Sequence, residues 1–177
     1  TDDITFTTTD KTVNARDLAA LGAKVDTFGV ASITTITENA KDVGVNAKNV
    51  TDALAIALGA DVKITGTITA DQANTISADI NAGVVTANIA AGIASDLLTA
   101  LVGVSDDEND ALTLIVNGGT AAAADLNKLD AKTSVAVNAS AITEITALAA
   151  NVSEVTTLYA ANTAKTVSGL GNEAIKI

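Results

Sequence analysis

Residues 123–152 read AADLNKLDAKTSVAVNASAITEITALAANV, and residues 15–43 read ARDLAALGAKVDTFGVASITTITENAKDV. Residues 123–152 contain one additional residue, and apart from this insertion the two stretches match along most of their length. The matching pairs are Asp17 and Asp125, Leu18 and Leu126, Leu21 and Leu129, Ala23 and Ala131, Lys24 and Lys132, Ile33 and Ile142, Ile36 and Ile145, and Val43 and Val152. Internal duplication of this kind predicts a repeat protein, so we call residues 15–43 the first copy and residues 123–152 the second copy.

Between and beyond the two copies, short helical phrases alternate with β-favouring runs. Weaker echoes of the helical phrase, each opening with an acidic residue, occur at 52–58, 71–76 and 96–101. The β-favouring runs are VKITGTI at 62–68, LTLIV at 112–116, SVAV at 134–137 and AIKI at 174–177. This alternation predicts an α/β chain of short helices and short strands.

The predicted helices carry capping signals at both ends. Small polar or acidic residues stand at the expected starts, where a side-chain oxygen can accept a free backbone N–H, and glycine follows the expected ends. The expected starts are Asn14, Thr51, Ala70 with Asp71, Ser95 and Asp125, and the glycines are Gly22, Gly59 and Gly103. Helices of only about two or three turns are marginal alone, so they must pack against strands.

One strand and one helix cannot bury their apolar faces alone, but successive units can stack and cover each other. The expected fold is therefore a solenoid-like stack with right-handed crossovers. Its core should be aliphatic, because the chain has only two Phe, one Tyr and no Trp. We expect a single domain over 1–177, with copies near 13–60, 61–119 and 120–177. A doubly wound sheet is the rival architecture, which the internal duplication disfavours.

Charge and composition exclude several classes of function. The formal net charge is −11, and no cluster of Lys or Arg occurs that could hold a phosphate backbone, so nucleic acid is not an expected partner. The chain has no Cys and no His, which removes thiolate metal sites and the usual base of a serine hydrolase. The most apolar stretch, 83–104, contains Asp96, so we expect a buried or half-buried helix there and no membrane span.

The acidic run SDDEND at 105–110 is the strongest candidate site. Asp106, Glu108 and Asp110 recur at every second position, as oxygen ligands do at the start of calcium loops. An EF-hand loop counted from Asp106 would need glycine at Ala111 and an acid at Asn117, and both are absent. A solvated loop is the main interpretation, and calcium binding through these three residues is the alternative.

Other chemistry is weakly supported, and we predict that the chain is not an enzyme. Lys128 and Lys132 are expected to form surface ion pairs, and Glu144 and Glu154, across a strand-to-helix turn, lack the aromatic platforms of a sugar cleft. The glycine-containing stretches at 117–120 and 168–171 lack the lysine of phosphate loops. The Thr-rich stretches do not form the regular ladder expected of an ice-binding face.

Residues 125–177, with the phrases SAITEIT and GLGNEA, resemble repeats of very large secreted proteins of marine cyanobacteria and related bacteria, often found beside hemolysin-type calcium-binding modules. The resemblance implies export, a cell-surface or matrix location and a structural role, and it supplies no catalytic residues. The function we expect is a non-catalytic spacer, adhesive or lattice element. The run AIKI has no polar cap, so its strand edge should pair with another chain or with neighbouring repeats.

Overall fold

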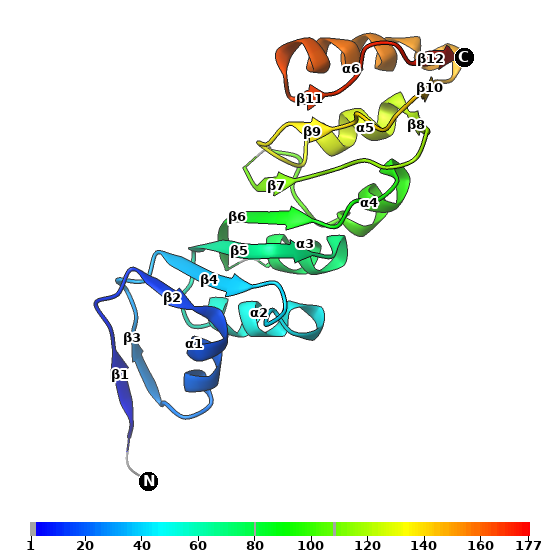
Figure 1. Cartoon of the computed structure of the whole chain (residues 1–177). Coiled ribbons are helices and arrows are strands. Elements are labelled where there is room, and N and C mark those ends of the chain that lie inside the picture. The colour runs from blue at the N-terminus through cyan, green and yellow to red at the C-terminus, as the bar shows by residue number, and fades with distance from the viewer. Residues whose placement is uncertain (1–2, 80, 108) are drawn as a thin grey trace. The chain divides into compact units, whose positions relative to one another are not determined.

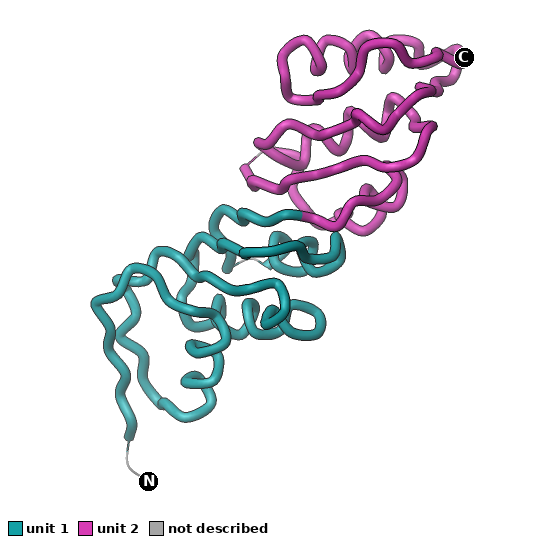
Figure 2. Tube along the Cα trace, viewed as in Figure 1, with its two compact units in different colours: residues 1–88 teal, residues 89–177 magenta. Residues whose placement is uncertain are grey.

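The computed structural model describes residues 3–79, 81–107 and 109–177. The chain is α/β and divides into two compact units, residues 1–88 and 89–177 (Figures 1 and 2). The division falls inside the expected middle copy, 61–119, and the boundaries of the three copies stay a prediction. The predicted α/β class is confirmed.

In the first unit, short parallel strands alternate with helices. The elements are β1 (Thr5–Thr7), β2 (Thr12–Asn14), α1 (Ala15–Gly22), β3 (Thr27–Gly29), β4 (Thr35–Asn39), the 3-10 helix η1 (Val45–Ala47), α2 (Lys48–Leu54), β5 (Ala60–Ile68), α3 (Ala70–Ser77) and β6 (Ala82–Ile89). Strand β4 lies between β2 and β5 and is parallel to both, so that Val13, Ile36 and Val62 stand in one row. Strand β1 pairs in parallel with β3.

The second unit has the same kinds of element. They are α4 (Ala94–Ala100), β7 (Ala111–Thr113), β8 (Thr120–Ala122), α5 (Ala123–Asp130), β9 (Val137–Asn138), β10 (Glu144–Thr146), the 3-10 helix η2 (Ala149–Asn151), α6 (Val152–Ala164), β11 (Val167–Ser168) and β12 (Ala174–Lys176). Strand β10 lies between β8 and β12 and is parallel to both, which puts Ala121, Ile145 and Ile175 in one row. Strand β9 pairs in parallel with β11.

The two copies follow the same path. Each follows directly on a three-residue strand, β2 or β8, and contains an eight-residue helix and two further short strands. These are α1, β3 and β4 in the first copy and α5, β9 and β10 in the second. Ile36 pairs with Val13, and its counterpart Ile145 pairs with Ala121. The last matched pair differs, because Val43 is buried whereas Val152 is 46% exposed at the start of α6.

The described core consists of Ala, Val, Ile and Leu, as the composition predicts. The largest fully buried side chains include Ile36, Leu54 and Ile76 in the first unit and Leu126, Ile145 and Leu158 in the second. Two of the three aromatic residues, Phe6 and Phe28, make an edge-to-face contact with ring centroids 6.2 Å apart, and both are half-buried. Alanine is fully buried at several helix starts, which lets short helices approach the strands closely.

Two of the predicted helix starts are correct, namely Asn14 before α1 and Ala70 with Asp71 in α3. Asn14 caps α1, and its side chain accepts a hydrogen bond from the Asp17 N–H at 3.2 Å. Helix α3 begins at Ala70 as predicted, and the residue before it, Thr69, supplies the side-chain cap. Thr51, Ser95 and Asp125 lie inside their helices, because α2, α4 and α5 begin up to three residues earlier. Alanine has the highest intrinsic helix propensity, and Ala94 and Ala123 are also buried, so these helices start before their polar residues.

The predicted helix ends and strands need further corrections. Gly22 is still part of α1, and Gly59 has φ +76° but lies in the turn before β5, well past the end of α2. Of the predicted run 134–137, only Val137 is in a strand. The runs at 62–68 and 174–177 do lie on β5 and β12.

The prediction of a buried or half-buried helix over 83–104 is wrong. Residues 82–89 form strand β6, and a short helix, α4, follows it. Burial alternates along β6, with Val85, Ala87 and Ile89 buried and the residues between them exposed, which is the two-residue period of a strand. Within the described ranges, no helix is long and apolar enough to cross a membrane.

Candidate functional site

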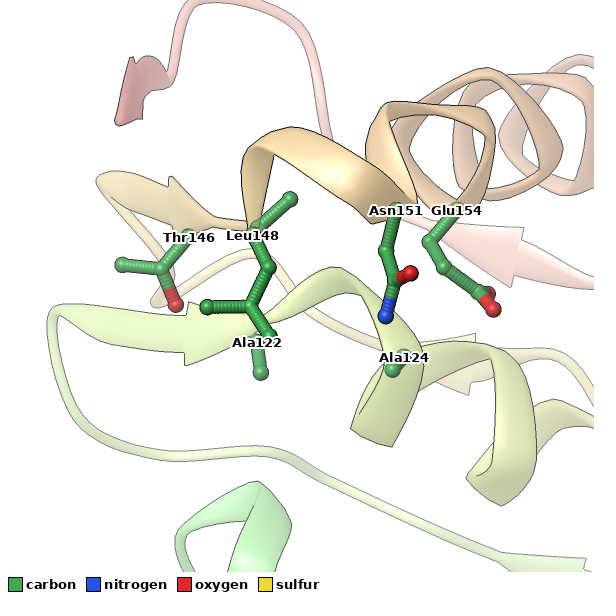
Figure 3. A pocket seen from close by; sticks show the side chains of 7 residues that line it. Ala122, Ala124, Thr146, Leu148, Asn151 and Glu154 are labelled. Carbon is green, nitrogen blue, oxygen red and sulfur yellow. The ribbon is translucent and has the colours of Figure 1, made fainter. Parts of the chain in front are cut away.

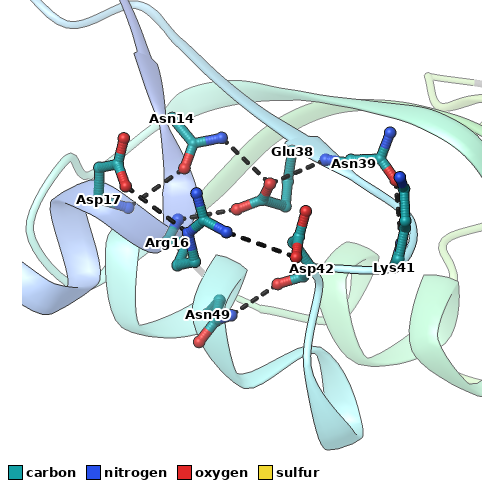
Figure 4. A network of polar contacts seen from close by, with 8 residues as sticks. All are labelled: Asn14, Arg16, Asp17, Glu38, Asn39, Lys41, Asp42 and Asn49. Carbon is teal, nitrogen blue, oxygen red and sulfur yellow. Dashed lines mark hydrogen bonds and ion pairs between the residues drawn. The ribbon is translucent and has the colours of Figure 1, made fainter.

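The buried carboxylate of Glu38 connects helix α1 to strand β4. Glu38 is 3% exposed, and its Oε2 accepts a hydrogen bond from the backbone N–H of Arg16 at 2.8 Å. Its Oε1 accepts from the Asn14 side-chain amide at 3.0 Å and from the Asn39 N–H at 2.8 Å (Figure 4). First-turn N–H groups have no partner within the helix, and the helix dipole favours negative charge there. Glu38 therefore caps a helix that lies 22 residues before it in the chain.

Exposed charges surround this buried group. The Arg16 guanidinium lies 3.4 Å from Asp42 and 3.6 Å from Asp17, and all three side chains are substantially exposed. Such pairs contribute little to stability. The Asn49 side chain of α2 donates to the Asp42 carbonyl at 2.6 Å, so the chain after β4 is held to the next helix (Figure 4).

The second copy has a hollow at the corresponding place. Asn14 corresponds to Ala122 and Glu38 to Ala147, so neither polar side chain is present. The hollow has a volume of about 320 Å³. Its walls are formed by Ala122, Ala124, Thr146, Ala147, Leu148, Asn151 and Glu154 (Figure 3). Helix α5 consequently begins without a side-chain cap, although Ala122 has φ −75° and ψ 136°, close to the φ −80° and ψ 135° of Asn14.

The same helix is tied to α6 by an amide. The Asn127 Nδ2 donates to the Glu154 carbonyl at 3.0 Å and to Glu154 Oε2 at 2.8 Å. Glu144 lies on β10 and Glu154 on α6, as predicted. Because the Glu154 side chain is held by Asn127, it serves to join two helices.

The acidic loop is tied to a buried lysine. Asp106 Oδ1 lies 2.9 Å from the Lys132 ammonium, which also donates to the Val104 carbonyl at 2.8 Å. The Lys132 side chain is only 7% exposed, so the prediction that it forms a surface pair on a helix is wrong. It lies beyond the end of α5, where the chain turns inward after Asp130.

Of the other two predicted calcium ligands, the structure describes only Asp110. The Asp110 carbonyl accepts from Thr133 Oγ at 3.3 Å and Ser134 Oγ at 3.0 Å, and Glu108 lies outside the described residues. In the part of the chain that the structure describes, no three acidic side chains gather as metal ligands. Calcium binding through Asp106, Glu108 and Asp110 stays a prediction.

A tyrosine of α6 holds the loop before β12. The Tyr159 hydroxyl donates to Glu173 Oε2 at 2.7 Å, and the Gly171 N–H donates to the same carboxylate. Burial, together with the Glu173 carboxylate, raises the pKa of Tyr159 to about 12. Burial alone would raise the pKa of Glu173, but the hydrogen bonds from Tyr159 and Gly171 outweigh it and lower that pKa. The GLGNEA phrase thus fixes the entry of the chain into β12.

Strand β12 has one paired edge and an exposed outer side. The Ala174 N–H donates to the Thr143 carbonyl at 2.9 Å, and the Lys176 carbonyl accepts from Ala147 at 3.0 Å. Alternate residues of a parallel strand direct their backbone groups to opposite edges, so the N–H and C=O of Ile175 point away from β10. The Ile175 side chain is 44% exposed, whereas Ile145 beside it is fully buried. This edge is the surface best suited to accept a further strand.

Comparison with protein-family models, curated proteins and solved structures finds no match to this chain.

Proposed function

We propose that the chain is a non-catalytic structural segment of an exported bacterial surface or matrix protein, built as a right-handed solenoid-like stack. In this role it acts as a spacer or as a self-assembling or adhesive element. The observation that carries the proposal is the equivalence of the two copies, which share both their element order and their contacts to the neighbouring strand.

The hydrogen bonds of the two copies support this reading in detail. Thr34 and Thr35 donate their N–H groups to the Lys11 carbonyl, and Thr143 and Glu144 donate theirs to the Gly119 carbonyl. The Thr34 hydroxyl also donates to Lys11 at 3.3 Å, and the Thr143 hydroxyl to Gly119 at 2.9 Å. Two stretches about 108 residues apart in the sequence thus dock on the preceding strand in one way.

Side-chain hydroxyls repeat this connection throughout both units. In each case a Ser or Thr donates to a backbone carbonyl about one strand-to-strand interval earlier. The further pairs are Ser32 to Thr8, Thr37 to Val13, Thr65 to Glu38, Ser134 to Asp110, Thr146 to Ala121 and Ser168 to Val137. A mechanical element is stabilised by links between successive strand–helix repeats, and not by one central core. They also give the abundant threonine a structural role.

The free edge of β12 supplies the means of assembly. A strand edge with unpaired backbone groups pairs readily with another strand. The backbone N–H and C=O of Ile175 lie on this edge. Its side chain is half-exposed, and it follows Ala121 and Ile145 in one row across β8, β10 and β12. Pairing with a further strand of the same kind would bury Ile175 as Ile145 is buried.

Sedimentation velocity of the chain and of the Ile175→Pro variant tests the proposal. Proline removes the outward N–H but leaves the Ala174 bond to Thr143 in place. We expect the chain to associate as its concentration rises and the variant to remain monomeric, with Ile175→Val as the matched control that keeps the edge. A strictly monomeric chain at high concentration contradicts self-assembly through this edge.

A further inference from the structure

The first unit has an apolar groove between β1, β2 and α1. Its volume is about 400 Å³. Its apolar walls come from Phe6, Val13, Leu18 and Leu21, and Asp10 and Asp17 lie at it as well. Leu18 is almost fully buried, but Phe6, Val13 and Leu21 are only half-buried.

The corresponding residues of the second unit are covered. Val13 corresponds to Ala121 and Leu21 to Leu129, which are 5% and 0% exposed. Phe6 corresponds to Leu114 by strand pairing. Phe6 pairs with Phe28 in β3, and Ile115, the residue after Leu114, forms a bridge to Asn138 in β9. Leu114 is also fully buried.

Helix α4 covers this surface in the second unit. It packs against α5 and β8, the counterparts of α1 and β2. Its Leu97 is 4% exposed, and Leu101, one turn later, is fully buried. The outward residues Ser95, Asp96 and Thr99 are polar or acidic. A short amphipathic helix is therefore what completes the face of a β8–α5 pair.

We propose that the groove of β1, β2 and α1 binds a short amphipathic helix of the α4 type, with two leucines one turn apart, supplied by another repeat of the same kind. The inference rests on the proposed function, because it extends the contact between successive repeats to the first copy. Recognition is of the helix-in-groove type, in which the apolar face of the helix fills a preformed hollow. Phe6, Val13 and Leu21 become buried, as their counterparts are in the second unit, where α4 packs against α5 and β8.

A peptide spanning residues 92–104, stapled on its polar face to hold the helix, is the probe. Titrated into the full chain, it is expected to bind one to one with a Kd of roughly 100 µM or tighter, because the staple reduces the ordering cost of a helix this short. A peptide carrying Leu97→Asp and Leu101→Asp should show no binding. NMR shift changes should fall on Phe6, Val13 and Leu21.

The matched protein variants are Leu21→Asp and Leu58→Asp. Leu21 lines the groove, whereas Leu58 is a 69% exposed leucine elsewhere in the same unit. Leu21→Asp should weaken binding at least about tenfold and Leu58→Asp should leave it unchanged. If Leu21→Asp unfolds the chain, the NMR shift changes that the peptide causes in the unmodified chain test the inference without this variant.

Absence of peptide binding, or shifts away from the groove, overturns the inference. A dimer that Leu21→Asp dissolves but that the α4 peptide does not compete with would show that another surface of a second copy fills the groove, and would overturn the inference as well. Neither result contradicts the proposed function, because association through Ile175 and the stacking of repeats do not depend on Leu21.

Discussion

Glu38 accepts a hydrogen bond from the backbone N–H of Arg16 at 2.8 Å, and this contact joins strand β4 to helix α1. The carboxylate is almost completely buried and makes two further hydrogen bonds. A buried charge is tolerated only when it is paired or fully hydrogen-bonded. Here the helix N-terminus and the Asn14 amide take the place of a counter-ion.

Replacing Glu38 should therefore be costly. Glu38→Ala leaves the Arg16 N–H and the Asn14 amide without their acceptor, and we expect a loss of about 3 kcal/mol in the free energy of unfolding. Urea denaturation measures this loss. Arg16→Ala is the control, because it removes exposed ion pairs but keeps the N–H, and its effect should stay below about 1 kcal/mol. Equal effects of the two variants would contradict the role of Glu38.

The uncapped helix α5 should be stabilised by a cap. Ala122 already has the backbone angles of Asn14, so Ala122→Asn can accept from the first-turn N–H groups without rearrangement. The free energy of unfolding should rise by about 1 kcal/mol, as measured by denaturation. Ala124→Asn, placed inside the helix, should not stabilise. A loss of stability in Ala122→Asn would show that the two copies are not equivalent at this position.

Calcium is expected to leave the melting temperature unchanged, because Asp106 is already neutralised by Lys132. Differential scanning calorimetry with and without millimolar calcium tests this alternative. Lys132→Gln removes the competing charge and serves as the sensitised control. A rise in melting temperature that Asp106→Asn abolishes would favour the calcium-dependent module instead.

The single tyrosine of the chain reports on the contact that positions β12. The pKa of Tyr159 is raised to about 12, so absorbance should titrate near pH 12 in the folded chain and near pH 10 in the unfolded chain. A raised pKa means that the contact stabilises the fold below about pH 10 and that this contribution is lost between about pH 10 and 12. Glu173→Gln should lower the midpoint. A native midpoint near 10 would mean that Tyr159 and Glu173 are not bonded.

The α/β class and the buried positions of the two copies could be predicted from the sequence, and the misplaced elements have physical explanations. Two of the matched pairs are buried in both units, namely Leu18 with Leu126 and Ile36 with Ile145. The segment around Val85 is a strand and not the predicted helix, because a long apolar run hides the two-residue period of a strand. Helix α4 begins before the predicted Ser95, because the buried Ala94 starts the helix ahead of the polar residue.

The site was harder to predict. Glu38 looks like an ordinary surface acid, since nothing near it in the sequence indicates that a helix 22 residues earlier lies over it. The difference between Glu38 and Ala147 in otherwise similar copies was the available signal. Likewise, the charged neighbours of Lys132 in sequence predict a surface position, but tertiary packing buries its side chain against Val104 and Asp106.

Small-angle X-ray scattering of the monomeric Ile175→Pro variant tests the central claim most directly. A compact globule of 177 residues has a radius of gyration of about 16 Å. A stack of strand and helix units is elongated, so the account predicts a clearly larger radius of gyration and a distance distribution with a long tail. A radius near 16 Å with a symmetric distribution would contradict it.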